Sequence, residues 1–383
     1  MDEPLSAEGL FVAFVFFVVL SQFLLYVGPD YISQPLRPLI VVILTVQVVR
    51  RGRLSLPVCN LALAMSIYQL LIWFFLYPNG GPFSEYMILV FYYMMLFSVA
   101  GFPWNRRELR LIIFAIFIAT FICAVVFCLS NNMRDYSDHA IMFVGEKVNR
   151  NKNAYTFAFG IVLGRCYLSY GKGRNKLLVL LIILVEGYCL LYSKSRGAFF
   201  GVVISMLIAA LTKAIRMKRN NNPYLFLYLL SLLAVFTIGF FMIKNSAWSR
   251  LVDSEDLSGR DDGIEHAVDL FLEAPLLGKI FGNGMLYEVN NTAGVGVHFV
   301  YLTYLLEAGI IGMMLVILLF VLSMKSMYGE LQWSIFIIAF SRTFFEGMDY
   351  YIFIPLILAL CLSNYERLYG RQCKELFYRP GYR

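Results

Sequence analysis

Long apolar segments recur along this chain of 383 residues, and they constrain its fold more than any other feature. Each of the longest holds about 18 or more residues with few charges, enough for a helix to cross roughly 30 Å of hydrocarbon. Hydrophobic residues make up 60% of the chain and charged residues 15%, whereas soluble proteins are about half apolar and about a quarter charged. The sequence therefore predicts an all-α, polytopic integral membrane protein, with residues 1–383 forming a single membrane domain.

The apolar segments predict about twelve transmembrane helices. Their expected ranges are 8–27, 36–49, 56–77, 85–102, 111–129, 154–170, 177–192, 198–214, 224–243, 297–322, 332–346 and 350–363. Most connections between these ranges are short. One is long and polar: residues 244–296 separate the ninth expected span from the tenth, and they are predicted to form a long loop inserted in the membrane domain.

Basic residues indicate how the chain is oriented, because cytoplasmic connections carry an excess of Lys and Arg. Five segments rich in these residues fall on one side of the predicted bundle: 50–53, 106–110, 172–176, 213–219 and the C-terminal tail. That side is predicted to be cytoplasmic, with both termini, and the long loop at 244–296 then lies on the outer, periplasmic side. The formal net charge of +7 follows this bias and does not indicate nucleic-acid binding.

Several kinds of chemistry lack their sequence signatures. The seven cysteines are scattered, mostly within apolar segments and without a CxxC pair, so neither a disulfide framework nor a zinc site is predicted. No P-loop, GxGxxG, HExxH or GxSxG motif occurs, and no Asp-x-Asp that would hold a metal-bound nucleotide sugar. We expect no metal and no cofactor.

Arg196 is the first candidate site residue, because it lies in an expected outer turn that reads Ser195-Arg196-Gly197-Ala198, next to Lys194. A guanidinium at this position can hold a phosphate through two parallel hydrogen bonds. The alternative is an arginine that extends its charge to the membrane interface.

Arg260 is the second candidate, at the start of an amphipathic helix expected over residues 260–273. A helix N-terminus offers unpaired N–H groups and partial positive charge, so Arg260 and this terminus together predict an anion site. Acidic residues crowd the same stretch, and a surface salt bridge is the alternative interpretation.

His298 is the third candidate, because it lies where the long loop re-enters the membrane. A neutral imidazole there can act as a general base or orient a hydroxyl group. The alternative is an interfacial histidine bonded to a loop carbonyl.

Further polar residues on the outer side are candidates for substrate binding. Lys147, Arg150 and Lys152, beside Asn153, can meet phosphate or sugar hydroxyls, although a solvated loop is the simpler interpretation. Arg342 is also a candidate, but Glu346 lies one helical turn away and can pair with it.

Taken in order, these motifs resemble the O-antigen ligase and polymerase superfamily. The resemblance covers about residues 150–322 and rests on Asn151-x-Asn153-Ala154, Ser195 to Ala198, Gly259-Arg260, Glu273 to Gly278, and His298 followed by Glu307 to Gly312. It implies a C-type membrane glycosyltransferase fold in the bacterial inner membrane. It also implies a donor glycan on undecaprenyl diphosphate at the periplasmic face.

The resemblance also implies roles for the three candidates. Arg196 and Arg260 are expected to hold the diphosphate, and His298 to activate or orient the acceptor hydroxyl. Transfer then consumes the glycosyl–diphosphate bond directly, as a metal-independent reaction that inverts the anomeric carbon. Expected partners are the lipid-linked oligosaccharide and membrane lipid, and a chain-length regulator is left open.

Three functions remain distinguishable. The first is a polymerase that joins repeat units of an O-antigen or other surface polysaccharide. The second is an O-antigen ligase that transfers the glycan to lipid A–core of lipopolysaccharide, although Phe299 departs from the polar residue usual after the ligase histidine. The third is a flippase or transporter, which would carry charges deep within several spans and helices broken at mid-membrane.

Overall fold

The computed structural model describes most of the chain between residues 57 and 370. The described residues are 57–76, 83–129, 140–143, 146–170, 175–193, 195–217, 255–284, 300–344 and 353–370, with isolated positions at 42–49, 373 and 376.

Nearly all of the described chain is helical. The helices are α3 (Pro57–Leu71, extended by a π-helical turn at Ile72–Leu76), α4 (Phe83–Gly101), α5 (Arg106–Leu129), α6 (Arg150–Tyr170), α7 (Lys176–Tyr192), α8 (Arg196–Met217), α11 (Glu255–Glu273), α12 (Leu276–Phe281), α14 (Val300–Lys325), α15 (Glu330–Arg342) and α16 (Phe353–Tyr369). Two short antiparallel strands, β1 (Ala140–Phe143) and β2 (Glu146–Asn149), precede α6.

The composition of these helices makes the chain a membrane protein. Among the described residues, three helices are long and apolar enough to cross a membrane, at Pro57–Phe74, Arg106–Leu129 and Val300–Lys325. One face of α7 is apolar and exposed through Leu177, Leu181, Leu184 and Tyr188, as expected of a helix side that contacts lipid.

Helices occupy nine of the twelve ranges predicted as spans. Of the others, 8–27 and 224–243 lie outside the described residues, and only a few positions of 36–49 are described.

The direction of each helix follows from its contacts. Tyr155 of α6 meets Arg342, near the end of α15, whereas Arg165 meets Glu330 at the start of α15. Gly201, near the start of α8, lies close to Ser341, which is also near the end of α15. Therefore α6 and α8 begin at the end of the bundle where α15 finishes.

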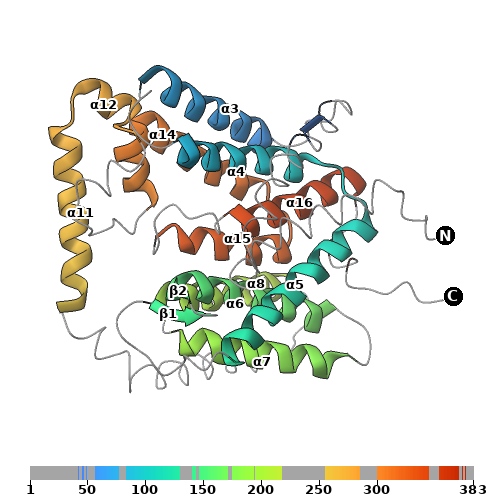
Figure 1. Ribbon diagram of the computed structural model, residues 1–383. Coiled ribbons are helices and arrows are strands. Elements are labelled where there is room, and N and C mark those ends of the chain that lie inside the picture. The colour runs from blue at the N-terminus through green and yellow to red at the C-terminus, as the bar shows by residue number, and fades with distance from the viewer. Residues whose placement is uncertain are drawn as a thin grey trace.

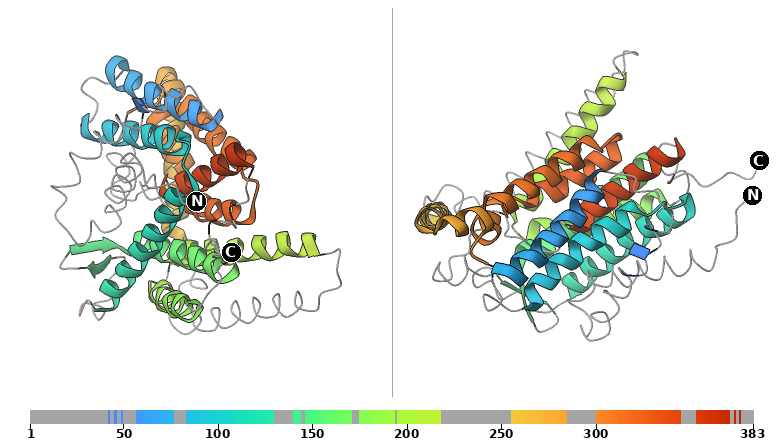
Figure 2. Two further views of the ribbon diagram at one scale, coloured as in Figure 1. Left: turned by 90° about the vertical axis from the view of Figure 1, so that its right-hand side faces the viewer. Right: turned by 90° about the horizontal axis from the view of Figure 1, so that it is seen from above.

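The start of α14 lies at this end too, because the Val300 N–H donates to the Thr343 carbonyl at 3.2 Å. Helix α16 runs parallel to α4, with Phe353 against Tyr93 and Asn364 bonded to the carbonyl of Ala100. In Figure 1, α11 extends across this end of the bundle, and the right-hand view of Figure 2 shows α11 nearly end-on beside the other helices. We call this end the α11 end.

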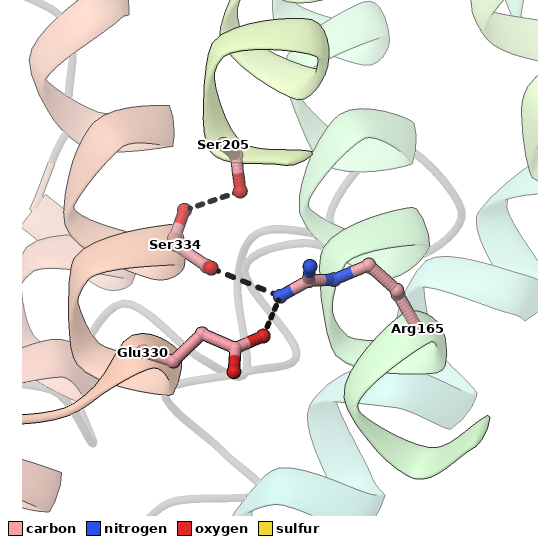
Figure 3. Close-up of polar contacts among 4 residues, drawn as sticks. All are labelled: Arg165, Ser205, Glu330 and Ser334. Carbon is pink, nitrogen blue, oxygen red and sulfur yellow. Dashed lines mark hydrogen bonds and ion pairs between the residues drawn. The ribbon is translucent and has the colours of Figure 1, made fainter. Parts of the chain in front are cut away.

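A charged cluster joins three helices toward the opposite end (Figure 3). Arg165 Nη2 of α6 donates to Glu330 Oε1 at 3.0 Å and to Ser334 Oγ at 3.1 Å, both on α15. Ser205 Oγ of α8 donates to the Ser334 carbonyl at 3.1 Å. Because both charges are largely buried, the ion pair is a fixed connection between α6 and α15 rather than a solvated surface contact.

Residues after α16 pack against the same opposite end. The Cys373 N–H donates to Glu366 Oε1 at 2.6 Å, and Arg110 Nε of α5 donates to the Leu376 carbonyl. Burial, with a contribution from the neighbouring Glu366, raises the pKa of the Cys373 thiol well above its usual value. Burial therefore disfavours the thiolate, which is the reactive form of this side chain.

Helix α14 corrects one prediction, because the continuous span expected over residues 297–322 is broken at Gly309. This residue has φ 69° and ψ −173°, a conformation that only glycine adopts readily. The carbonyls exposed by the break all have partners from elsewhere. Asn283 N–H donates to Leu306 O at 2.9 Å, Gly284 N–H to Glu307 O at 3.1 Å, and Tyr68 Oη to Ala308 O at 2.8 Å.

The break depends on a close approach between α14 and the segment after α12. A Cβ on Gly309 would lie 2.3 Å from the Ile280 carbonyl oxygen, and one on Gly282 would lie 2.1 Å from that of Glu307. Gly282 has φ 94° and ψ 171°, again a conformation restricted to glycine. The two backbones are therefore interlocked at positions where neither chain tolerates a side chain.

Two further local predictions are corrected. The amphipathic helix expected from residue 260 begins at Glu255, where acidic residues in the first turn suit the positive end of the helix dipole. The loop expected before the span at 154–170 contains the β1–β2 hairpin, and α6 already begins at Arg150.

Candidate functional site

Arg342 is the best-defined candidate residue at the α11 end. It lies in the last turn of α15 with only 1% of its surface exposed. Its guanidinium carbon lies 5.0 Å from the centre of the Tyr155 ring of α6, within the range of a cation–π interaction. The contact places a permanent positive charge at the junction of α6 and α15.

Thr343 connects this arginine to the start of α14. Its carbonyl accepts the Val300 N–H, and its hydroxyl donates to the Phe340 carbonyl at 2.7 Å. Since that hydroxyl proton is in use, Tyr301 Oη donates to Thr343 Oγ1 at 3.3 Å. The end of α15 and the start of α14 are therefore held together by two hydrogen bonds. His298, two residues before Val300, lies outside the described residues.

The start of α8 lies at the same end. Arg196 is the first residue of this helix, preceded by the buried Ser195, and its side chain lies outside the described residues, as does Lys194. A Cβ on Gly201 would lie 2.5 Å from Ser341 Oγ, so α8 and α15 are in close contact there. Five residues separate Arg196 from Gly201, about 7.5 Å along the helix axis. The Arg196 backbone and Arg342 thus share the α11 end.

The remaining basic candidates of this region precede or open α6. Lys147 belongs to β2, whereas Arg150, Lys152 and Asn153 form the first turn of α6, and the side chains of all four lie outside the described residues. Their helix leads directly into Tyr155, the aromatic partner of Arg342. The backbone therefore brings this segment to the α11 end as well.

Arg260 lies on α11, but not at its N-terminus. It follows Glu255 by five residues, so the unpaired N–H groups of the first turn belong to earlier positions, and the predicted pairing of Arg260 with a helix terminus is wrong. Ala267 of α11 is buried against Leu306 of α14. Because seven residues make about two helical turns, position 260 shares the helix face of Ala267. The side chain of Arg260 lies outside the described residues.

Helix α11 also carries an apolar stripe that the bundle does not cover. Ile264, Val268 and Leu272 recur at four-residue spacing and are exposed, Leu272 by 61%. This stripe adjoins the buried face of α11, whereas Glu265 and Asp269 lie on its other side. A helix with one face on protein, one apolar face exposed and one charged face fits a position at a membrane–water interface.

Sequence reasoning missed the groups that hold Arg342 in place. Tyr155 belongs to another helix, and Thr343 directly follows Arg342 as the C-cap residue of α15. Nothing in their local sequence distinguishes them from the many other hydroxyl and aromatic residues. It also missed the buried hydroxyl pair of Tyr93 and Tyr304, which hydrogen-bond to one another beneath the site. A tyrosine within an apolar span is the only available signal for such a pair, and it is a weak one.

Comparisons with known proteins identify no relative: no family model matches the chain, and no curated protein does. In the described part of the chain, no group of three or more His, Cys, Asp or Glu residues lies close enough together to hold a metal ion.

Proposed function

We propose that this chain is a membrane glycosyltransferase of the bacterial inner membrane. It joins repeat units of a surface polysaccharide at the periplasmic face and uses a glycan on undecaprenyl diphosphate as its donor. One observation carries the proposal: the buried guanidinium of Arg342 lies at the α11 end, where the starts of α6, α8 and α14 meet the end of α15. The identity of the donor rests on the sequence resemblance.

The proposed reaction needs positive charge where a diphosphate leaves. As the glycosidic bond breaks, the electron pair moves to the diphosphate oxygen, and arginine side chains stabilise the developing charge. Their effect is stronger at a buried position than in bulk water, because the surroundings screen it less. Arg342 supplies a positive charge at such a buried position. Arg196 is proposed to approach it from the start of α8, and Arg260 from α11.

The acceptor is proposed to attack from the opposite side of the anomeric carbon. A sugar hydroxyl of a second lipid-linked unit forms the new glycosidic bond, and His298 takes its proton. The diphosphate leaves on its polyprenyl chain, so bond making and bond breaking balance without nucleotide hydrolysis. Direct displacement inverts the configuration of the donor sugar.

Two observations favour a transporter of lipid-linked glycans as a second candidate. Helix α14 is broken at Gly309, and Glu186 of α7 is buried within the bundle. Broken helices and buried charges at mid-membrane are typical of transporters. However, residues 310–325 still form a helix of roughly 24 Å after the break. The break therefore lies toward the α11 end, and this geometry favours the transferase.

A deletion strain separates the functions through the lipopolysaccharide it makes, resolved on a gel. Core carrying a single repeat supports the polymerase. Long chains that remain on the lipid carrier, with none on the core, would replace it by the ligase. Repeats that never reach the periplasm would replace both by the transporter.

Variants of Arg342 test the site itself. We expect Arg342→Lys to lower polymer formation by about 10- to 100-fold, because lysine keeps the charge but loses the paired hydrogen bonds to phosphate, worth about 1.5–3 kcal/mol. Tyr155→Phe keeps the ring beneath the guanidinium and should retain activity, whereas Tyr155→Leu should lose it. Arg107→Lys, at an exposed position on α5, is the matched control. Wild-type polymer from a normally folded Arg342→Lys protein would remove this arginine from the site.

A further inference from the structure

Two cysteines that are distant in sequence lie side by side in the fold. Cys128 Sγ of α5 is 3.4 Å from Cys189 Sγ of α7. Cys189 is fully buried, whereas Cys128, the penultimate residue of α5, is partly exposed. Cys189 also donates to the Ala124 carbonyl one turn earlier on α5, at 3.5 Å. The two sulfur atoms therefore face one another between the last turns of two neighbouring helices.

Both cysteines lie toward the α11 end. Helices α5 and α7 run in the same direction, because Thr120 lies beside Glu186 and Ala124 beside Cys189. Helix α7 ends at Tyr192, and α8 begins four residues later at Arg196. In the orientation proposed above, the sulfur pair is on the periplasmic side of the membrane, where disulfides form and persist.

We propose that Cys128 and Cys189 are a redox-active pair that closes a disulfide between α5 and α7 on the periplasmic side. A disulfide has a sulfur–sulfur distance of about 2.05 Å, so the two atoms need to approach by roughly 1.3 Å. Rotation of the Cys128 side chain in the last turn of α5 supplies this movement. The hydrogen bond from Cys189 to Ala124 is lost in the same step.

The oxidant is a disulfide-bearing thiol oxidase of the compartment. The Cys128 thiolate, at the partly exposed position, attacks the disulfide of the oxidase and forms a mixed disulfide. Cys189 then attacks the Cys128 sulfur, and the oxidase leaves as a dithiol. The two thiols lose two electrons and two protons, and the oxidase takes up these electrons and protons as its disulfide becomes a dithiol.

The disulfide fixes the end of α7, and through the three residues that follow it the start of α8. Its effect is therefore to hold the Ser195–Arg196 turn in place. The inference rests on the proposed orientation of the chain, but not on glycan transfer. If the wild-type protein lacks the bond and still makes normal polysaccharide, the disulfide is overturned and the proposed function stands.

Mass spectrometry of the full-length protein in its native membranes tests the pair. Thiols are blocked with N-ethylmaleimide during lysis, and the protein is denatured and digested without reductant. We expect the peptides containing Cys128 and Cys189 to be joined, and to separate only after reduction. If both cysteines carry the blocking group before reduction, the proposal is wrong.

Two variants serve as controls. Cys189→Ala should leave Cys128 labelled by N-ethylmaleimide, since its partner is gone and alanine is tolerated at a buried apolar position. Cys166→Ser in α6 should leave the joined peptides unchanged. Labelling of Cys128 that is as low in Cys189→Ala as in the wild type would assign its protection to burial and overturn the pair.

Discussion

Glu186 shows how a single glycine makes room for a carboxyl group inside the helix bundle. Its side chain is fully buried in α7. A Cβ on Gly160 of α6 would lie 2.1 Å from Glu186 Oε1 and 2.6 Å from Thr120 Oγ1 of α5. Three helices therefore meet at this point only because one of them has no side chain there.

Adding one methyl group at position 160 should destabilise the protein. We expect Gly160→Ala to cost about 1–3 kcal/mol, because the new atom forces the carboxyl group out of its position. Glu186→Ala in the same chain should recover part of that loss, since the space is vacated. Unfolding temperatures in detergent measure both effects.

Gly187, one residue after Glu186, is the matched control for this pair. No atom outside its own helix segment lies within 4 Å of a Cβ placed there, so Gly187→Ala should leave stability unchanged or slightly raised. Strictly additive losses in the Gly160 and Glu186 double variant would show that the two positions do not interact.

The Arg165–Glu330 ion pair gives a second test at the residue scale. We expect Glu330→Met to destabilise the protein by about 3 kcal/mol, because it leaves a largely buried guanidinium without its counter-charge. The double variant Arg165→Met, Glu330→Met should be more stable than Glu330→Met alone, since no buried charge remains. A double variant less stable than either single one would contradict this account. Unfolding in detergent provides the measurement.

At the scale of helices, local sequence predicted most elements well and failed where another segment intervened. The apolar run at 111–129 predicted α5, which begins earlier, at Arg106. Asn105 Oδ1 accepts the Glu108 N–H at 3.0 Å, and the Glu108 carboxylate accepts the Asn105 N–H at 2.9 Å, so a capping box extends the helix beyond its apolar run. That signal is local, and the sequence contains it.

The break in α14 could not be predicted in the same way. Gly309 lies within an apolar run typical of a continuous span, and its conformation depends on the Asn283 and Gly284 N–H groups, which bond the carbonyls before it. Likewise, the sequence identified Arg342 as a candidate but not the Tyr155 ring that it contacts. Contacts between distant segments determine both features, and hydrophobic periodicity carries no information about them.

Gly309→Ala tests whether the interlocked backbones hold α14 and α12 together. We expect a loss of at least about 2 kcal/mol, because alanine is strained at this φ and ψ and its Cβ would meet the Ile280 carbonyl. Gly282→Ala should have a similar effect for the same reason. Unfolding temperature again provides the measurement. Wild-type stability in both variants would mean that α12 does not dock on α14 in this way.

The exposed stripe of α11 predicts contact with lipid. We expect a tryptophan introduced as Val268→Trp to be quenched by brominated lipids in reconstituted vesicles, after subtraction of the wild-type signal. Asp269→Trp, on the charged side of the same helix, should be quenched much less, because that face is exposed to water. Equal quenching at the two positions would contradict an interfacial orientation of α11.

At the scale of the whole molecule, alternating helix directions bring the polar candidates to one end. Helices α6, α8 and α14 begin there, α15 finishes there, and α11 lies across it. Of the basic connections predicted to be cytoplasmic, the one described in full is the start of α5, which lies at the opposite end, where Arg110 bonds the Leu376 carbonyl. Charge patterning predicts a division into two sides, because it is read from each connection separately. It could not predict which helices are neighbours.

Labelling of introduced cysteines tests the orientation directly. Asp269→Cys on α11 and Lys325→Cys at the end of α14 are both exposed polar positions at opposite ends of the bundle. We expect a membrane-impermeant maleimide to label Asp269→Cys in cells whose outer membrane is permeabilised and whose inner membrane is intact. Lys325→Cys should be labelled only after the inner membrane is opened.

The parent chain controls for its own cysteines, which are buried except for the partly exposed Cys128. Labelling of Lys325→Cys before the inner membrane is opened would reverse the orientation. The α11 end, with Arg342 and the starts of α6 and α8, would then face the cytoplasm. A donor presented in the periplasm could not reach it, so this single result would exclude the proposed glycan transfer while leaving the fold unchanged.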